Sequence, residues 1–225
     1  MLKVKKQLSL ILVVAALSAC TSIERFNTEK TELQATSAHT ANLRIASNHP
    51  GVFAIPNSKC IALDGNVVKV IGKLPKRDEK ASFLRGTRDW AVKEFPINSL
   101  GMPKVDLIDL NKKFDLALSG KTYASREFKI NAGEPLTIFI KKQGSSIGLL
   151  LHSAETEYGF GYSFVPQKGH DYEVVMQSHS STSGSQHAGF QTTYHYSYAL
   201  FDITRGQIVN LTKTAQWARG CSDIK

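Results

Sequence analysis

A Gly-x-Ser-x-Gly stretch is the first place where the chain could carry out chemistry. It spans residues 144–148 with Ser146 at its centre. Asp171 lies downstream of it, and His179, His187 and His195 follow Asp171. The order Ser, Asp, His suits a serine nucleophile on a sharp strand-to-helix turn of a parallel sheet. The residues after Gly148 look strand-like instead, and no HGGG-type oxyanion loop precedes the motif. We therefore interpret the stretch as a Gly/Ser turn and expect no enzyme, with a serine hydrolase on Ser146 as an alternative.

The histidines themselves could bind a metal, because zinc favours imidazole ligands. His179 and His187 flank the sequence SSTSGSQ, so a hairpin there would bring them across from each other, and His195 is a third candidate. None of the compact ligand spacings such as H-E-x-x-H occurs. We favour surface histidines and no cofactor, and keep a metal-binding or small-ligand site at these histidines as an alternative.

Two runs of alternating aromatic residues form the third constellation. They consist of Tyr158, Phe160, Tyr162 and Phe164, and of Tyr194, Tyr196 and Tyr198. Aromatic rings stack on sugar faces, so a glycan is one conceivable partner. Aromatic residues at strand spacing more often belong to the core, and that is the interpretation we favour.

The elements that must position these residues are short strands. Period-two alternation recurs in the second half of the chain, at 158–164, 171–177 and 193–203, with Gly-containing turn signals between. Further strands are expected near 51–55, 59–63 and 67–72, and a short helix at 87–95 that ends before Pro96, within an irregular insertion at 76–111. The pattern predicts an all-β fold, an antiparallel β-sandwich of immunoglobulin-like or transthyretin-like type with a short helical or irregular insertion.

The N-terminus reads as an export signal. Three lysines, Lys3, Lys5 and Lys6, precede an apolar run at 7–19 that is shorter than the about 20 residues of a spanning helix. The run ends in Leu-Ser-Ala-Cys at 17–20, which resembles the lipobox of bacterial lipoproteins. The resemblance implies a signal peptide at 1–19 and a lipid anchor on Cys20. In enteric lipoproteins an Asp after the lipidated cysteine favours retention in the inner membrane. Because Thr21 stands at this position, the resemblance implies the outer membrane, with the protein facing the periplasm.

Composition divides the chain after the signal peptide into a tether and a domain, and its net charge is moderate. Removing residues 1–19 lowers the 28 basic residues by three to 25 against 19 acidic ones, and the formal charge from +9 to +6. The basic residues are dispersed, so no nucleic acid partner is expected. Residues 20–48 are rich in Thr, Ser, Asn and Glu, which predicts the lipidated cysteine and a flexible tether. Residues 49–225 are long enough for one β-sandwich domain.

A family resemblance covers about residues 125–175. It rests on Arg-Glu-Phe at 126–128, Ala-Gly-Glu-Pro at 132–135 and the run from Phe164 to Val174. Together these resemble the core of a group of uncharacterised proteobacterial outer-membrane lipoproteins, which also tend to carry one early and one late cysteine. The resemblance implies fold and location, and no activity.

Cys60 and Cys221 are the two cysteines left once Cys20 is lipidated. An even pair in an exported domain predicts a disulfide, with two unpaired thiols as the alternative. The function that we expect is that of a non-catalytic envelope lipoprotein, a binding or structural module whose partner is a protein or glycan of the envelope.

Overall fold

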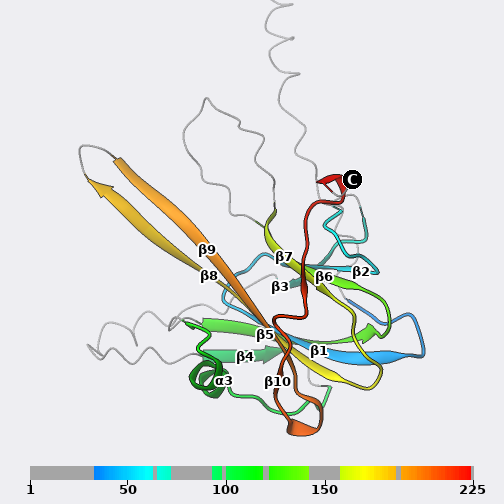
Figure 1. The fold of residues 1–225 in the computed structure, drawn as a ribbon. Helices are drawn as coiled ribbons and strands as arrows, with labels where there is room; N and C mark the ends of the chain where they lie inside the picture. Colours follow the sequence, from blue (N-terminus) through cyan, green and yellow to red (C-terminus); the bar gives the residue numbers. More distant parts are fainter. Residues whose placement is uncertain are drawn as a thin grey trace, which may run out of the picture.

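The computed structural model describes residues 33–62, 65–71, 93–97, 100–118, 122–141, 158–185 and 189–223. Its strands form two sheets that enclose a shared core, as Figure 1 shows. The predicted all-β sandwich with a short helical insertion is therefore confirmed. No helix among these residues is long and apolar enough to span a bilayer.

The first sheet has the strand order β10-β9-β8-β1-β5-β4. Its members are β1 (Thr40–Ser47), β4 (Lys93–Ile97), β5 (Thr122–Asn131), β8 (Asp171–Ser185), β9 (Gly189–Asp202) and β10 (Val209–Asn210). The pairs β1–β8 and β4–β5 are parallel, whereas the other neighbours are antiparallel. The antiparallel pattern expected from the sequence therefore holds for most strand pairs of this sheet and not for these two.

The second sheet has the order β11-β7-β6-β2-β3, and all its pairs are antiparallel. Its members are β2 (Val52–Pro56), β3 (Val68–Ile71), β6 (Leu136–Lys141), β7 (Tyr158–Phe164) and β11 (Gln216–Trp217). Two short 3-10 turns, Thr204–Gly206 and Cys221–Asp223, complete the C-terminal part of the chain.

The main core lies between the two sheets. Leu43 and Ile45 of β1 are fully buried there, together with Ile138 and Ile140 of β6 and Leu200 of β9. Successive residues of a strand point to opposite faces, so the residues between these positions reach the outer faces of the sheets. Strand β1 thus needs a second cover on its other side.

The helix α3 (Leu107–Phe114) is part of that cover. Leu107 and Leu110 are buried in a second apolar cluster with Ala46 and Phe201 of the first sheet. Asp106 caps the helix by accepting a hydrogen bond from the Ile108 backbone N–H at 2.7 Å. The first sheet is therefore buried on both of its faces around β1.

Several sequence expectations are wrong. The tether was expected to reach residue 48, but β1 begins at Thr40 and Leu33 is already buried, so the folded part starts earlier. Residues 59–62 form no strand, although Ile61 makes a single bridge to Gly220. Lys93–Ile97 is a strand, where the end of a helix at 87–95 was expected, and residues 87–92 lie outside the described residues.

Other expectations are confirmed. Strands β2, β3 and β7 lie where the sequence predicts them, and so do residues 171–177 of β8 and 193–202 of β9, although both of these strands continue further than predicted. Gly133, Gly169 and Gly206 have φ angles of +82°, +75° and +76° at three of the predicted turns. Glycine adopts this left-handed conformation without steric cost, which explains why these turns carry it.

Candidate functional site

The hairpin of β8 and β9 extends beyond the rest of the sandwich. Its two strands pair continuously from Tyr172 with Asp202 to Ser185 with Gly189. The neighbouring strand β1 accompanies β8 only as far as Met176, and β10 accompanies β9 only at Phe201 and Asp202. We call residues 177–185 of β8 and 189–197 of β9 the arm. Figure 1 shows this arm projecting from the body of the domain.

Both long edges of the arm lack a further strand among the described residues. A strand edge carries backbone N–H and C=O groups that can pair with another chain, and proteins usually protect such edges with charged residues, proline or bulges. Residues 177–184 and 193–197 contain no charged Lys, Arg, Asp or Glu and no proline. The Asn48 side chain bonds the Ser178 backbone N–H at 2.8 Å and its carbonyl at 3.1 Å, and beyond Ser178 no further strand accompanies either edge of the arm among the described residues.

The arm brings two of the candidate histidines together. His179 and His195 are directly opposite in the register, and their ring centroids lie 4.7 Å apart with an angle of 14° between the planes. The expected partner of His179 was His187, but the hairpin turns at Ser185 and Gly189, which pairs His179 with His195 instead. His187 lies outside the described residues. Both paired histidines are exposed, as expected for surface histidines.

A closed zinc site needs about four ligands. The Ser181 hydroxyl lies 3.4 Å from Nε2 of His195. Within the part of the chain that the structure describes, no group of three or more His, Cys, Asp or Glu side chains could hold a metal ion. The described arm thus supplies two imidazoles and no complete ligand set.

Those residues of the serine hydrolase alternative that the structure describes are not brought together. Ser146 and its glycines lie outside the described residues. Asp171 begins β8 and accepts a hydrogen bond from Asn42 Nδ2 at 2.8 Å, whereas His179 lies eight residues further along the same strand. At about 3.3 Å per residue, that separation is about 26 Å, so Asp171 cannot orient His179 or its neighbour His195.

A different histidine is paired with a carboxylate. His170 Nδ1 lies 2.6 Å from Asp202 Oδ2, and Asp202 also accepts hydrogen bonds from the Thr204 hydroxyl and from its backbone N–H. Burial raises the pKa of Asp202, but the hydrogen bonds from Thr204 and His170 outweigh burial and lower the pKa below its ordinary value. This arrangement fixes the turn after β9, at the end of the β8–β9 pair opposite the arm.

An aromatic cluster occupies the seam between the sheets beside the arm. Tyr162 of β7 stacks on Tyr198 of β9 with ring centroids 3.6 Å apart, and Phe160 lies 6.4 Å from Tyr196. Partly buried Phe160, Tyr196 and Tyr198 pack against the main core, which confirms the core interpretation for them. Trp217 of β11 also joins the cluster, and 54 % of its surface is exposed.

The surroundings of Gly161 explain why a glycine stands between the aromatic residues of β7. A Cβ atom added there would lie 2.8 Å from Phe139 Cβ and 3.0 Å from Ile61 Cδ1. Glycine is therefore required at this position, because the Phe139 side chain of β6 and the Ile61 side chain approach the backbone closely.

A buried ion cluster holds the α3 segment against the first sheet. Arg44 of β1 donates to Glu127 Oε1 at 2.6 Å and 3.0 Å, and to Glu173 Oε2 at 3.0 Å. Its Nη1 also donates to the Pro103 carbonyl at 3.0 Å, and Glu127 accepts from the Leu100 backbone N–H. Burial lowers the pKa of Arg44, but the two carboxylates outweigh burial and raise it. We interpret the cluster as structural, since these contacts join β1 to β5 and β8 and tie the strands to the 100–118 segment.

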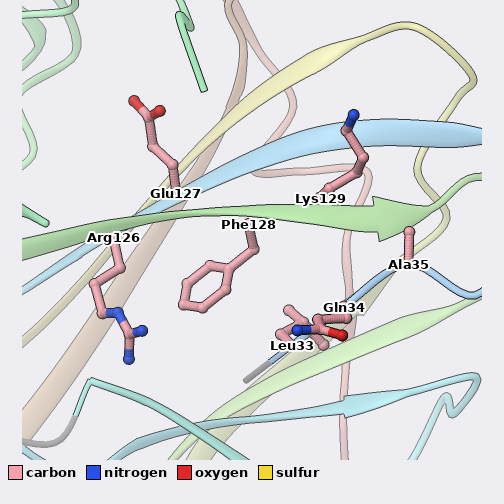
Figure 2. A pocket seen from close by; sticks show the side chains of 7 residues that line it. All are labelled: Leu33, Gln34, Ala35, Arg126, Glu127, Phe128 and Lys129. Atoms are coloured by element: carbon pink, nitrogen blue, oxygen red, sulfur yellow. The ribbon is translucent and has the colours of Figure 1, made fainter. Parts of the chain in front are cut away.

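A pocket of about 280 Å³ lies where the N-terminal segment meets β5. Figure 2 shows the side chains of Arg126 and Phe128 on the same side of β5 as Leu33 and Gln34. The Arg126 guanidinium lies 5.2 Å from the centre of the Phe128 ring and donates to the Val70 carbonyl at 3.3 Å. The contacts of Arg126 are thus within its own domain, and Leu33 closes this edge of the sandwich.

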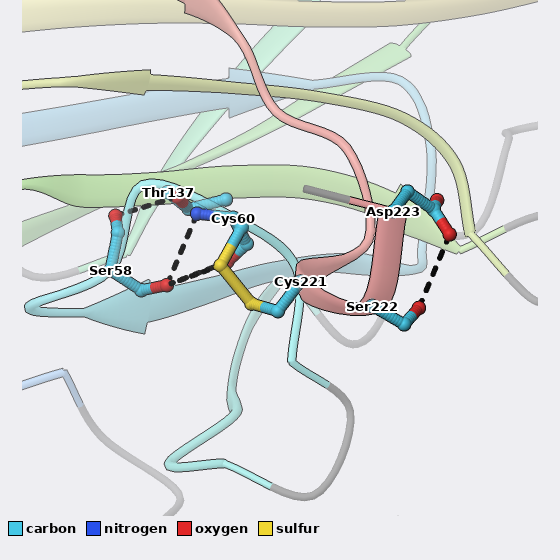
Figure 3. Close-up of a disulfide and its surroundings, with 6 residues drawn as sticks. All are labelled: Ser58, Cys60, Thr137, Cys221, Ser222 and Asp223. Atoms are coloured by element: carbon cyan, nitrogen blue, oxygen red, sulfur yellow. Dashed lines mark hydrogen bonds between the residues drawn. A yellow bond between two sulfur atoms is a disulfide. The ribbon is translucent and has the colours of Figure 1, made fainter. Parts of the chain in front are cut away.

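The predicted disulfide is present. Cys60 and Cys221 are bonded with their Cα atoms 5.0 Å apart, as Figure 3 shows. The backbone N–H of Cys221 donates to the Ile61 carbonyl at 3.1 Å, and the Ser58 hydroxyl donates to the Cys60 carbonyl at 2.6 Å. The bond therefore attaches the C-terminal segment, which carries Trp217, to the second sheet.

Comparisons with protein-family models, with curated proteins and with solved structures find no match to this chain. The resemblance to proteobacterial lipoproteins therefore stays a prediction from the sequence motifs. The arm and the exposed Trp217 are the features of the described surface from which a function can be argued.

Proposed function

We propose that this protein is a non-catalytic lipoprotein of the bacterial envelope. Cys20 would anchor it to the outer membrane, and the β-sandwich would present the arm to a protein partner in the periplasm. The single observation that supports binding by the arm is that, beyond Ser178, no further strand accompanies either of its edges among the described residues.

Strand addition is the mode of binding that suits this surface. An extended segment of a partner would continue the sheet by main-chain hydrogen bonds, and side-chain pockets would add specificity. The exposed side chains of the arm are mainly Ser, Thr, His and Tyr, so neither sign of charge in the partner is repelled. The body of the domain, buried on both faces of the first sheet, provides a rigid base for the arm.

The length of the tether limits where the domain can act. Leu33 is buried and follows Cys20 by thirteen residues. A fully extended chain of that length spans at most about 45 Å. If Cys20 is lipidated, the folded domain therefore stays close to the membrane that holds its anchor.

Shortening the arm tests this proposal. A variant in which residues 180–194 are replaced by Asn-Gly, a two-residue hairpin turn, should keep its melting temperature because the removed segment adds no buried apolar residue in the described part. The tagged full chain and the shortened chain are then purified from detergent-solubilised membranes of cells producing each at equal levels. The proposal predicts a partner that copurifies with the full chain and is lost with the shortened one. An identical set of copurifying proteins would contradict it.

The stacked pair His179 and His195 favours a second candidate, a metal-binding or small-ligand lipoprotein. Two imidazoles would supply part of a zinc site, and a further ligand would have to come from elsewhere. Calorimetric titration of the full chain with zinc tests it. Saturable binding that His195→Ala abolishes would support this candidate, and the absence of binding would exclude zinc.

A further inference from the structure

Trp217 is a large aromatic side chain left half exposed in a fixed position. It lies on β11 at the edge of the second sheet, opposite Tyr162 of β7 in the register. The backbone N–H of Ala218 donates to the Gly161 carbonyl at 2.9 Å, and the disulfide at Cys221 fixes the chain four residues later. The backbone that carries the indole is thus held from both sides.

The indole ring is supported by its edge contacts. Its centre lies 5.1 Å from Phe160 and 5.4 Å from Tyr162, with interplanar angles of 90° and 73°. Both contacts are edge-to-face, so no aromatic ring of the described residues lies parallel on the indole. A ligand that stacks on the indole therefore meets a preformed surface and does not have to order the side chain first.

The surroundings of Trp217 are polar without being strongly charged. Gln216 and Thr214 are exposed next to it along the chain, with Lys213 and Arg219 at the flanks. The Tyr198 hydroxyl donates to the Thr212 carbonyl at 3.1 Å nearby. No run of exposed aliphatic side chains accompanies the indole on this segment, as insertion into a membrane interface would require.

We propose that Trp217 is the stacking platform of a binding site for a neutral oligosaccharide. A sugar ring has an apolar face of C–H groups and a rim of hydroxyls. The indole face suits the first, because aromatic rings offer a large flat apolar surface. The Tyr162 hydroxyl suits the second, because Tyr162 is directly opposite Trp217 in the register, on the same face of the sheet, and a hydroxyl donates and accepts hydrogen bonds. This site is separate from the edges of the arm, and it does not depend on a protein partner.

Titration of the full chain with chitotetraose, a linear tetramer of N-acetylglucosamine, tests the proposal. The protein is kept in a zwitterionic detergent without a sugar headgroup, and binding is followed by calorimetry and by tryptophan fluorescence. We expect saturation below about 10 mM and at least a tenfold weaker affinity for Trp217→Ala, about 1.4 kcal/mol. Trp217→Phe should lie between the two, because a smaller ring remains. Val209→Ala, a change of an exposed apolar residue on β10, should bind like the unchanged protein.

Unchanged melting temperatures of the variants must accompany these results, so that a loss of binding reports on the site. The proposal is overturned if chitotetraose does not bind, or if Trp217→Ala binds it as well as the unchanged protein does. It is also overturned if Trp217 is needed instead for binding to phosphatidylglycerol vesicles or to a proline-rich peptide. The copurification result for the shortened arm would stand in each of these cases.

Discussion

Removing the charge of Arg44 tests the interpretation of the buried ion cluster. Its partners Glu127 and Glu173 expose 7 % and 1 % of their side chains. Arg44→Met leaves two carboxylates buried without the guanidinium that pairs with both of them, and it breaks the bond to the Pro103 carbonyl. Removing one partner of a buried ion pair costs about 3–5 kcal/mol, so we expect a loss of that size in the free energy of unfolding.

Equilibrium unfolding in urea, followed by circular dichroism, measures this loss. With a slope of about 2 kcal/mol/M, the midpoint should fall by about 2 M. Lys112→Met is the matched control, because Lys112 and its partner Asp109 are 74 % and 76 % exposed and their atoms are 4.0 Å apart. Exposed pairs contribute about 0–1 kcal/mol, so the midpoint of the control should hardly move.

Replacing the whole cluster separates charge burial from lost packing. In Arg44→Met combined with Glu127→Leu and Glu173→Met, no charge of the triad remains buried, and stability should recover by most of the loss. A single variant Arg44→Met that unfolds at the same midpoint as Lys112→Met would refute the reasoning. A triple variant less stable than the single one would show that the carboxylates stabilise the fold by contacts of their own.

Three further predictions concern the anchor, the disulfide and pH. Cys20→Ser should abolish labelling by an alkyne fatty acid and leave a longer precursor on a gel; undiminished labelling would exclude the lipid anchor. The denatured, unreduced protein should show no free thiol from Cys60 and Cys221, and reactive thiols would contradict this pairing. Replacing both cysteines by alanine should lower the free energy of unfolding by up to about 5 kcal/mol, since the bond joins residues 161 apart in sequence. Because the pKa of Asp202 is lowered in the fold, its stabilising contribution is present above its unfolded pKa of about 3.9 and is lost as the pH falls through the folded value. Asp202→Asn should therefore lower the melting temperature at pH 7 and make little difference at pH 2, and an equal difference at both would count against this.

The strands with one buried face could be predicted from the sequence. In β7 and β9 the aromatic residues alternate with glycine, serine or histidine, because one side of each strand faces the core. Strand β1 could not be predicted in this way, because both of its faces are buried and Arg44 in its centre looks like a solvent residue. Only the carboxylates from β5 and β8 explain this arginine, and their positions depend on the tertiary fold.

The arm was missed because of its composition. Residues 180–185 are Ser, Thr and Gly, which are typical of loops, and strand propensity depends strongly on neighbours. These residues form a strand because β8 and β9 pair continuously up to the turn of the hairpin. The local sequence by itself does not favour a strand there. The disulfide, in contrast, could be predicted from the two cysteines that are left once Cys20 is assigned to a lipid anchor in an exported protein. The position of Trp217 could not be predicted, because it depends on the disulfide and on β11, which place the indole against the aromatic cluster.

Site-specific photo-crosslinking in living cells tests the central proposal most directly. A photo-reactive amino acid replaces Ser181 on the arm of the lipidated full chain, and in a control it replaces Lys168, which is exposed in the turn before β8. We expect a discrete crosslinked protein from the Ser181 position and none from the Lys168 position. The absence of an adduct at Ser181, or the same adduct from both positions, would contradict the proposal that the arm binds a partner.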